Sequence, residues 1–172
     1  MIRSENMLRK IRISFFIMLC FNSCVGPSYE KTFLSKYEFE DFSQFNEINI
    51  FKRGGDENNQ CIAIDVPFFV NGTLRTGCCT VTLDKKTYQV IGTKWPTESY
   101  IYADSVKLQQ LAQTFMQYNI PRLEVDEQGN VFVYLKDVET LALVRFANEK
   151  ELQKRSKEMH WINIKHNWYK PR

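Results

Sequence analysis

The stretch that decides the fold runs from Ile62 to Leu83 and reads IAIDVPFFVNGTLRTGCCTVTL. Apolar residues alternate along its first half, and Asn71-Gly72 at its centre is typical of a two-residue β-turn. Pairing across this turn places Val70 opposite Thr73, Val66 opposite Gly77, Ile64 opposite Cys79, Ile62 opposite Val81 and Cys61 opposite Thr82. The apolar side chains then share one face, so the stretch predicts an antiparallel hairpin. Pro67 predicts that its first strand lies at an edge or contains a bulge.

Further strands are expected on both sides of this hairpin. Residues 47–52 alternate with period two, whereas residues 53–59 are rich in Gly, Asp and Asn and predict a loop. A turn at 84–87 leads into a strand at 88–91. The remaining strands are expected at 123–125, 131–135, 141–146 and, as one closing strand, 160–169.

Two helices are expected between the strands. Asp104 is a suitable N-cap for a helix that Asn119 and Pro121 end. Its apolar stripe consists of Leu108, Leu111, Ala112 and Phe115. A charged helix is expected at about 149–159, while residues 30–45 fit a helix or a strand. The pattern predicts an α+β fold over residues 31–172, a single domain in which an antiparallel sheet of meanders and hairpins packs with one or two helices.

The first 23 residues have the pattern of a secretory signal peptide. The basic residues Arg3, Arg9, Lys10 and Arg12 come first, and an apolar run from Ile13 to Phe21 follows. This run of about 9–11 residues is too short for a membrane-spanning helix, which needs about 20. We therefore expect a cleaved signal over residues 1–23, with Met7 as an alternative start, and a short tether over residues 24–30.

The sequence Phe21-Asn22-Ser23-Cys24 resembles the lipobox of bacterial lipoproteins, in which a cysteine after a small residue becomes the lipidated first residue. The resemblance implies that Cys24 carries a diacylglyceryl group and often a further acyl chain such as palmitate. More than one chain gives stable anchoring to a membrane. Because Val25 rather than Asp follows the cysteine, the resemblance also implies the outer membrane, facing the periplasm. An ordinary cleaved signal that contains cysteines is the alternative.

The composition is that of a folded domain, with 44% hydrophobic and 25% charged residues among 172. It excludes a disordered, collagen-like or low-complexity chain. Cleavage after residue 23 leaves 149 residues, enough to bury a core without disulfides or metals. Four basic residues and one acidic residue lie in the signal, so the mature chain has 19 of each and no net charge. Nucleic-acid binding therefore loses its electrostatic support.

No catalytic or metal-binding pattern is recognisable in the mature domain. The hairpin register sets Cys61 about 10 Å or more from Cys79, beyond the Cα limit of roughly 7 Å for a disulfide. We expect Cys79 to be a small core residue. Neither Cys78 nor Cys79 stands at a helix start that would activate a nucleophile, and His160 and His166 lie too far apart on one strand to share a metal. We expect no catalytic residue, no metal and no cofactor.

The C-terminal segment is the candidate for recognition. From Lys150 to Arg172 there are seven basic and two acidic residues, a local charge of +5. The residues expected to bind a partner are Trp161, Lys165, His166, Trp168 and Tyr169. Trp and Tyr are frequent in interface hot spots, and aromatic faces also stack on sugars. The alternative is a closing strand whose tryptophans cap the core while the charges face water.

Small size, envelope location and the lack of a catalytic motif favour a non-catalytic binding module. We expect a protein partner, in an inhibitor, immunity-type or envelope-assembly role, and contact with the membrane through the lipid at Cys24. A glycan- or cell-wall-binding module is one alternative. An enzyme whose active-site residues are dispersed along the sequence is the other.

Overall fold

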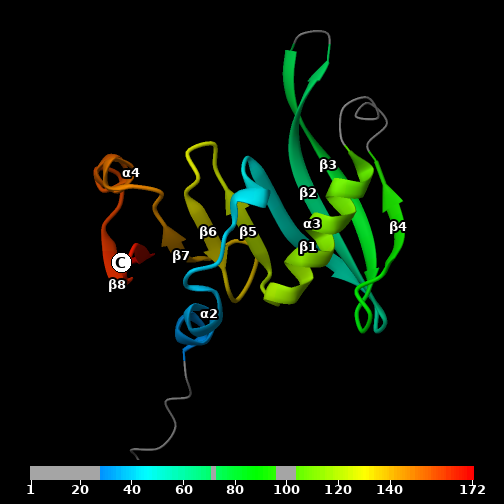
Figure 1. The fold of residues 1–172 in the computed structure, drawn as a ribbon, viewed down its shortest axis with the longest axis horizontal. Helices are drawn as coiled ribbons and strands as arrows, with labels where there is room; N and C mark the ends of the chain where they lie inside the picture. Colours follow the sequence, from blue (N-terminus) through cyan, green and yellow to red (C-terminus); the bar gives the residue numbers. More distant parts are fainter. Residues whose placement is uncertain (1–27, 71–72, 96–103) are drawn as a thin grey trace, which may run out of the picture. The chain divides into compact units, whose positions relative to one another are not determined.

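Antiparallel strands in one sheet make up most of the regular structure (Figure 1). The computed structural model describes residues 28–70, 73–95 and 104–172, with side chains described outside residues 66–75. The strands are β1 (Ile48–Gly55), β2 (Asn59–Val70), β3 (Thr73–Asp84), β4 (Val90–Lys94), β5 (Arg122–Val125), β6 (Val131–Tyr134), β7 (Leu141–Arg145), β8 (Trp161–Lys165) and β9 (Trp168–Pro171). The helices are α2 (Tyr29–Tyr37), α3 (Ser105–Tyr118), α4 (Glu149–Arg155) and the short 3₁₀ helix η1 (Ser43–Phe45). The fold is therefore α+β, as the sequence predicts.

The chain divides into two units at Lys36, and the second, Tyr37–Arg172, is compact. The second unit contains the whole sheet together with α3 and α4. The expected signal peptide, the expected lipidation at Cys24 and the predicted turn Asn71-Gly72 lie outside the described residues.

The strand order in the sheet is β4-β3-β2-β1-β5-β6-β7-β9-β8. Consecutive strands pair from β1 to β4 and again from β5 to β7, as expected for short connections. Helix α3 carries the chain from β4, at one edge, to β5, which pairs with β1 inside the sheet. A C-terminal hairpin completes the sheet, because β9 pairs with β7 and β8 then forms the second edge.

The hairpin of β2 and β3 has the register that the sequence predicts. Its pairs include Val70 with Thr73, Val66 with Gly77, Ile64 with Cys79, Ile62 with Val81 and Cys61 with Thr82. The pairing of β2 with β1 reaches only to Asp65, whereas its pairing with β3 continues through Pro67 without interruption. Strand β2 therefore lies inside the sheet and not at its edge, and no bulge interrupts its pairing with β3, so both expectations for this strand are wrong; Pro67 is accommodated because it lies in a part of β2 that extends past β1.

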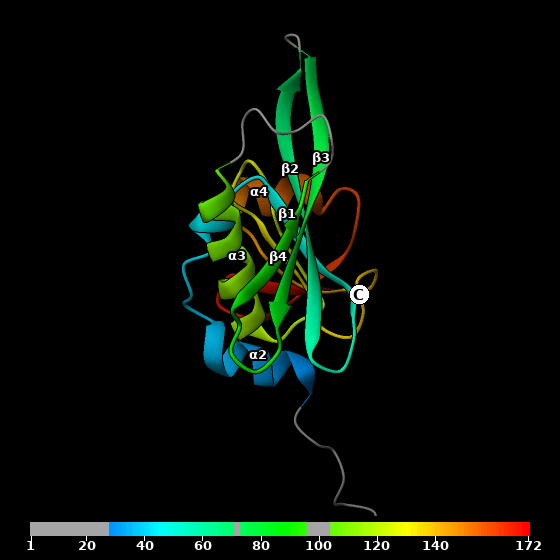
Figure 2. The same cartoon turned by 90° about the vertical axis from the view of Figure 1, so that its right-hand side faces the viewer.

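Helix α3 begins and ends at the predicted residues. The side chain of Asp104 accepts hydrogen bonds from the backbone N–H groups of Val106 and Lys107 at 2.9 and 3.3 Å. Asn119, with φ of 51°, ends the helix in the left-handed conformation. The predicted stripe is buried: Leu108, Leu111, Ala112 and Phe115. Figure 2 shows α3 along one side of the sheet, where it packs on β2 and β3.

Two expected boundaries differ in the structure. Strand β1 continues through Gly54 and Gly55, where composition predicts a loop. These glycines adopt φ of 124° and 153°, and they accommodate a register shift between Lys52 and Gly54. Strand β4 begins at Val90 because Tyr88, with φ of 56°, still belongs to the preceding turn.

The C-terminal segment is a hairpin rather than the single strand that its alternation predicts. His166 has φ of 49° and reverses the chain between β8 and β9. Because the chain folds back, Lys165 pairs with Trp168. Helix α4 also ends early, at Arg155, so that residues 156–160 connect it to β8.

In addition to the core between α3 and the sheet, a second apolar cluster lies on the side of the sheet opposite to α3, at the end formed by β6 and β7. Its buried members are Phe132, Tyr134, Val144 and Phe146, and Leu141, Leu152, Trp161 and Tyr169 pack against them. The strand register shows that these side chains share one face of the sheet. Glu124 pairs with Phe132, Phe132 pairs with Val144, and Val144 pairs with Tyr169. Helix α4 and strand β8 therefore close this end, whereas Asn49, Asp65 and Thr80 of β1 to β3, on the same side, are half-buried.

Candidate binding site

Trp168 lies at the centre of the packing of the C-terminal hairpin. Its side chain is fully buried, and its indole N–H donates a hydrogen bond of 3.0 Å to the backbone carbonyl of Glu38. The ring packs edge-on against Phe42, and the guanidinium of Arg145 lies 5.4 Å from its centroid. Trp168 thus joins β9 to the segment before η1. This burial corrects the expectation that its ring offers a face to a partner.

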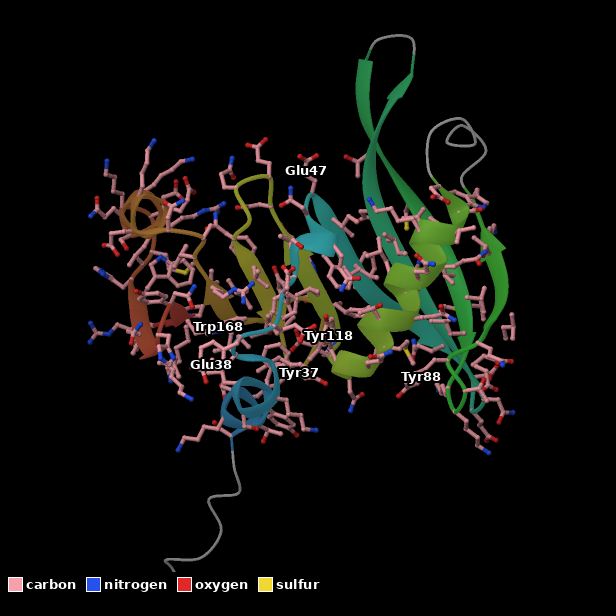
Figure 3. All side chains as sticks on the ribbon, viewed as in Figure 1. Tyr37, Glu38, Glu47, Tyr88, Tyr118 and Trp168 are labelled. Carbon is pink, nitrogen blue, oxygen red and sulfur yellow. The ribbon has the colours of Figure 1, made fainter. Side chains whose placement is uncertain are left out.

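The carboxylate of Glu38 holds the turn between β8 and β9. Nζ of Lys165 donates to one oxygen at 2.5 Å, and Nδ1 of His166 contacts the other. The Glu38 side chain is 7% exposed, whereas those of Lys165 and His166 are 54% and 58% exposed. The hydrogen bond from Lys165, together with that from His166, keeps the pKa of Glu38 below its ordinary value despite its burial. In Figure 3 Glu38 and Trp168 lie close to each other.

A small exposed surface surrounds the same turn. The ring of His166 lies 5.4 Å from that of Phe39, centroid to centroid, and Phe39 is 81% exposed. We define Phe39, Lys165 and His166 as the hairpin surface. It combines an apolar ring with two basic side chains whose positions are fixed by a carboxylate beneath them.

Trp161 and Tyr169 belong to a different part of the molecule. Both rings pack edge-on against Phe146, at 5.3 and 5.4 Å between centroids, in the second apolar cluster. The Trp161 indole N–H is buried without a hydrogen-bond partner among the described residues. The five residues predicted to bind are therefore divided: Lys165 and His166 are exposed together, Trp168 is enclosed, and Trp161 and Tyr169 are half-buried on the other side.

Strand β8 forms an open edge of the sheet beside this surface. The backbone N–H of Arg172 donates to the carbonyl of His160 at 3.1 Å. His160 and Arg172 are therefore a hydrogen-bonded pair at the start of the ladder between β8 and β9. Hydrogen-bonded and non-hydrogen-bonded pairs alternate in antiparallel ladders, so the backbone groups of Trp161 and Asn163 face away from β9. Outward N–H and C=O groups on an edge strand are a template for pairing with another chain.

Sequence reasoning missed Glu38, Phe39 and the open edge. An acidic excess between Ser28 and Val66, with eight acidic and four basic residues, is a sequence signal for a region that could face the basic C-terminus. It did not distinguish Glu38 from its acidic neighbours. The position of β8 at an edge follows only from the strand order of the sheet. The alternation of apolar and polar residues along one segment does not reveal that order.

The chemistry of the thiols argues against a cysteine nucleophile. Cys61, Cys78 and Cys79 are free. Burial raises the pKa of Cys79 to about 11, and burial and then the charge of Asp65 raise the pKa of Cys78. Both thiols are therefore protonated near neutral pH.

Metal and membrane sites were sought in the part of the chain that the structure describes. No group of three or more His, Cys, Asp or Glu side chains there is arranged to hold a metal ion. No helix within the same residues has the length and apolar character to cross a membrane.

Comparison of the chain with protein-family models, with curated proteins and with solved structures found no match. The function must therefore be inferred from the geometry itself. An open sheet edge and a preorganised basic surface are suited to binding.

Proposed function

We propose that this protein is a non-catalytic binding module, lipid-anchored at Cys24 in the bacterial envelope, and that its partner is a protein. The observation that carries the proposal is the open edge of β8, next to the hairpin surface. An extended segment of the partner adds to this edge as a further strand. Main-chain hydrogen bonds supply affinity in this mode, and flanking side chains supply specificity.

The charge around β8 favours an acidic partner segment. The stretch from Lys150 to Arg172 carries a local charge of +5, and Lys154 and Lys157 are exposed on and just after α4. Charge complementarity of this kind accelerates association and fixes the register of the bound segment. Arg155 and Lys165 are paired with Asp126 and Glu38, and the remaining excess of positive charge attracts an acidic strand and repels a basic one.

The hairpin surface is ordered before the partner arrives. Lys165 and His166 are held by Glu38, and the turn beneath them is joined to Glu38 by the Trp168 hydrogen bond. Side chains that are already immobilised lose less conformational entropy on binding. Phe39, exposed beside His166, supplies apolar area for the same contact.

The anchor is proposed on the lipobox-like sequence that ends at Cys24. We propose that it places the domain on the outer membrane, facing the periplasm. Metabolic labelling with a palmitate analogue tests the site, with Cys20→Ala as the matched control. Cys24→Ala should abolish labelling while Cys20→Ala preserves it. Labelling that persists in Cys24→Ala would contradict the assignment.

Partner binding is tested with the full chain, solubilised in mild detergent and used to capture proteins from solubilised envelopes. Asn163→Pro removes an outward N–H of β8 and also the side-chain amide that donates to the carbonyl of His166 at 2.8 Å, whereas Lys154→Glu with Lys157→Glu reverses the local charge and leaves that hydrogen bond in place. Lys107→Glu, an exposed change on α3, is the control. We expect one stoichiometric partner, lost in both test variants and retained in the control.

Equal capture by all variants would contradict the use of the β8 edge. The identity of the partner then separates the possible roles. An enzyme or toxin whose activity falls on binding indicates an inhibitor or immunity role, and an envelope-assembly component indicates an assembly role. Far-UV and near-UV circular dichroism of each variant shows that it is folded.

A further inference from the structure

A hollow of about 400 Å³ lies on the side of the sheet opposite to α3, and the binding proposed at β8 does not use it. It is lined by Arg53, Cys61, Cys78, Thr80, Lys94 and Trp95. Cys78 and Thr80 alternate along β3 with buried residues that face α3, which places the hollow on the uncovered side. Its volume is within the range of small-molecule sites, about 300–1,000 Å³.

Two cations give the hollow its charge. Arg53 and Lys94 are exposed, and among the described residues neither forms an ion pair with a carboxylate. The described polar contact of Arg53 is with Sγ of Cys78, at 4.0 Å. Asp65 pairs with Cys78 across the β2–β3 ladder, and its carboxylate, which also accepts a hydrogen bond from Asn49, lies beside the Cys78 thiol just outside the lining. An anion in the hollow therefore meets two cations that form no ion pair with a described carboxylate, while Asp65 lies at the Cys78 side of the hollow.

The remaining lining favours a ring that carries hydroxyl groups. Trp95 contributes an indole, an aromatic surface on which the C–H face of a sugar ring packs. Thr80 contributes a hydroxyl that donates or accepts a hydrogen bond. Cys61 and Cys78 contribute small, weakly polar side chains that leave room for the ring.

We propose that this hollow binds a carboxylate-bearing sugar, such as a uronic acid residue of an acidic polysaccharide. The carboxylate lies between Arg53 and Lys94, and the ring packs against Trp95. The site is separate from the β8 edge, so a domain anchored at the membrane binds a protein at one site and an acidic glycan at the other.

The test uses the full chain in detergent and isothermal titration with galacturonic acid oligomers, with neutral galactose oligomers and inorganic phosphate as comparisons. We expect galacturonate oligomers to bind at least tenfold more tightly than either comparison, and added salt to weaken the binding. Arg53→Gln and Lys94→Gln should each weaken it about tenfold, and Trp95→Leu should do the same. Lys107→Gln, which removes an exposed charge from α3, should leave it unchanged.

The thiols provide an independent measurement of where the sugar lies. Cys61 and Cys78 line the hollow, whereas Cys79 is buried on the other side of β3. Bound galacturonate should slow alkylation of Cys61 and Cys78, measured by mass spectrometry, without changing that of Cys79. Equal binding of the neutral oligomer, equal binding of phosphate, or no binding at all would each overturn the proposal. Unchanged alkylation in the presence of a binding sugar would overturn the location.

Discussion

Trp168 and Trp161 give a paired test of how the C-terminal hairpin is held. In Trp168→Phe the backbone carbonyl of Glu38 loses its indole donor and remains buried, which costs about 1–3 kcal/mol. The smaller ring also leaves a gap beside Phe42 and Arg145, worth about 1–2 kcal/mol of lost apolar burial. The free energy of unfolding should therefore fall by about 2–5 kcal/mol.

Trp161→Phe is the matched substitution, because it removes an indole N–H that has no described hydrogen-bond partner, whereas Trp168→Phe removes one that is hydrogen-bonded. The Trp161 N–H is buried without a described partner, so its removal gains about 1–3 kcal/mol and offsets a similar loss of packing. Urea and thermal denaturation followed by circular dichroism measure both variants. A difference of about 3 kcal/mol corresponds to roughly 6–12 °C in Tm for a chain of this size. Equal Tm values for the two variants would refute the role of the Trp168–Glu38 hydrogen bond.

Two further variants test how Glu38 holds the turn between β8 and β9, and how Gly55 fits the connection between β1 and β2. Because the pKa of Glu38 is lowered in the folded state, its contribution to stability is present above its ordinary pKa of 4.5 and is lost as the pH falls through the lower folded pKa. Glu38→Gln should therefore destabilise the protein at pH 7 and reduce its loss of stability in acid; an unchanged pH profile of urea unfolding would contradict this. Gly55→Ala should cost at least about 1–3 kcal/mol, because φ is 153° and the added Cβ would lie 2.2 Å from the carbonyl oxygen of Asn59. Gly92→Ala, whose Cβ meets no atom within 4 Å, is the control, and equal midpoints for the two alanine variants would count against the close approach of Gly55 to Asn59.

The sequence predicts the β2–β3 hairpin and α3 well because local chemistry determines both. Alternation and the turn dipeptide together leave one register in which the apolar side chains share a face, and that register is observed. Asp104 and Asn119 have side chains and conformations suited to helix ends. Each of these signals lies within a few residues of the feature that it predicts.

The candidate site could be predicted only in part, because its contacts join residues far apart in the sequence. Glu38 meets Lys165 and His166 across more than 120 positions, and composition does not distinguish it from Glu40 or Asp41. The turn at His166 requires a left-handed conformation that no glycine signals. Without that turn, the alternation predicts one strand over residues 160–169. Such a strand gives no reason to expect Trp168 to be more buried than Trp161.

Site-specific photo-cross-linking in intact cells tests the central claim, which is that β8 is the edge on which a protein partner adds. A photoreactive amino acid replaces Ile162 of the full chain, and Val106 of α3 is the control, since these apolar side chains are 41% and 59% exposed. We predict one discrete protein adduct from position 162, absent from position 106 and lost when Asn163→Pro is combined with the probe. No adduct at position 162, or the same adducts at both positions, would contradict the account.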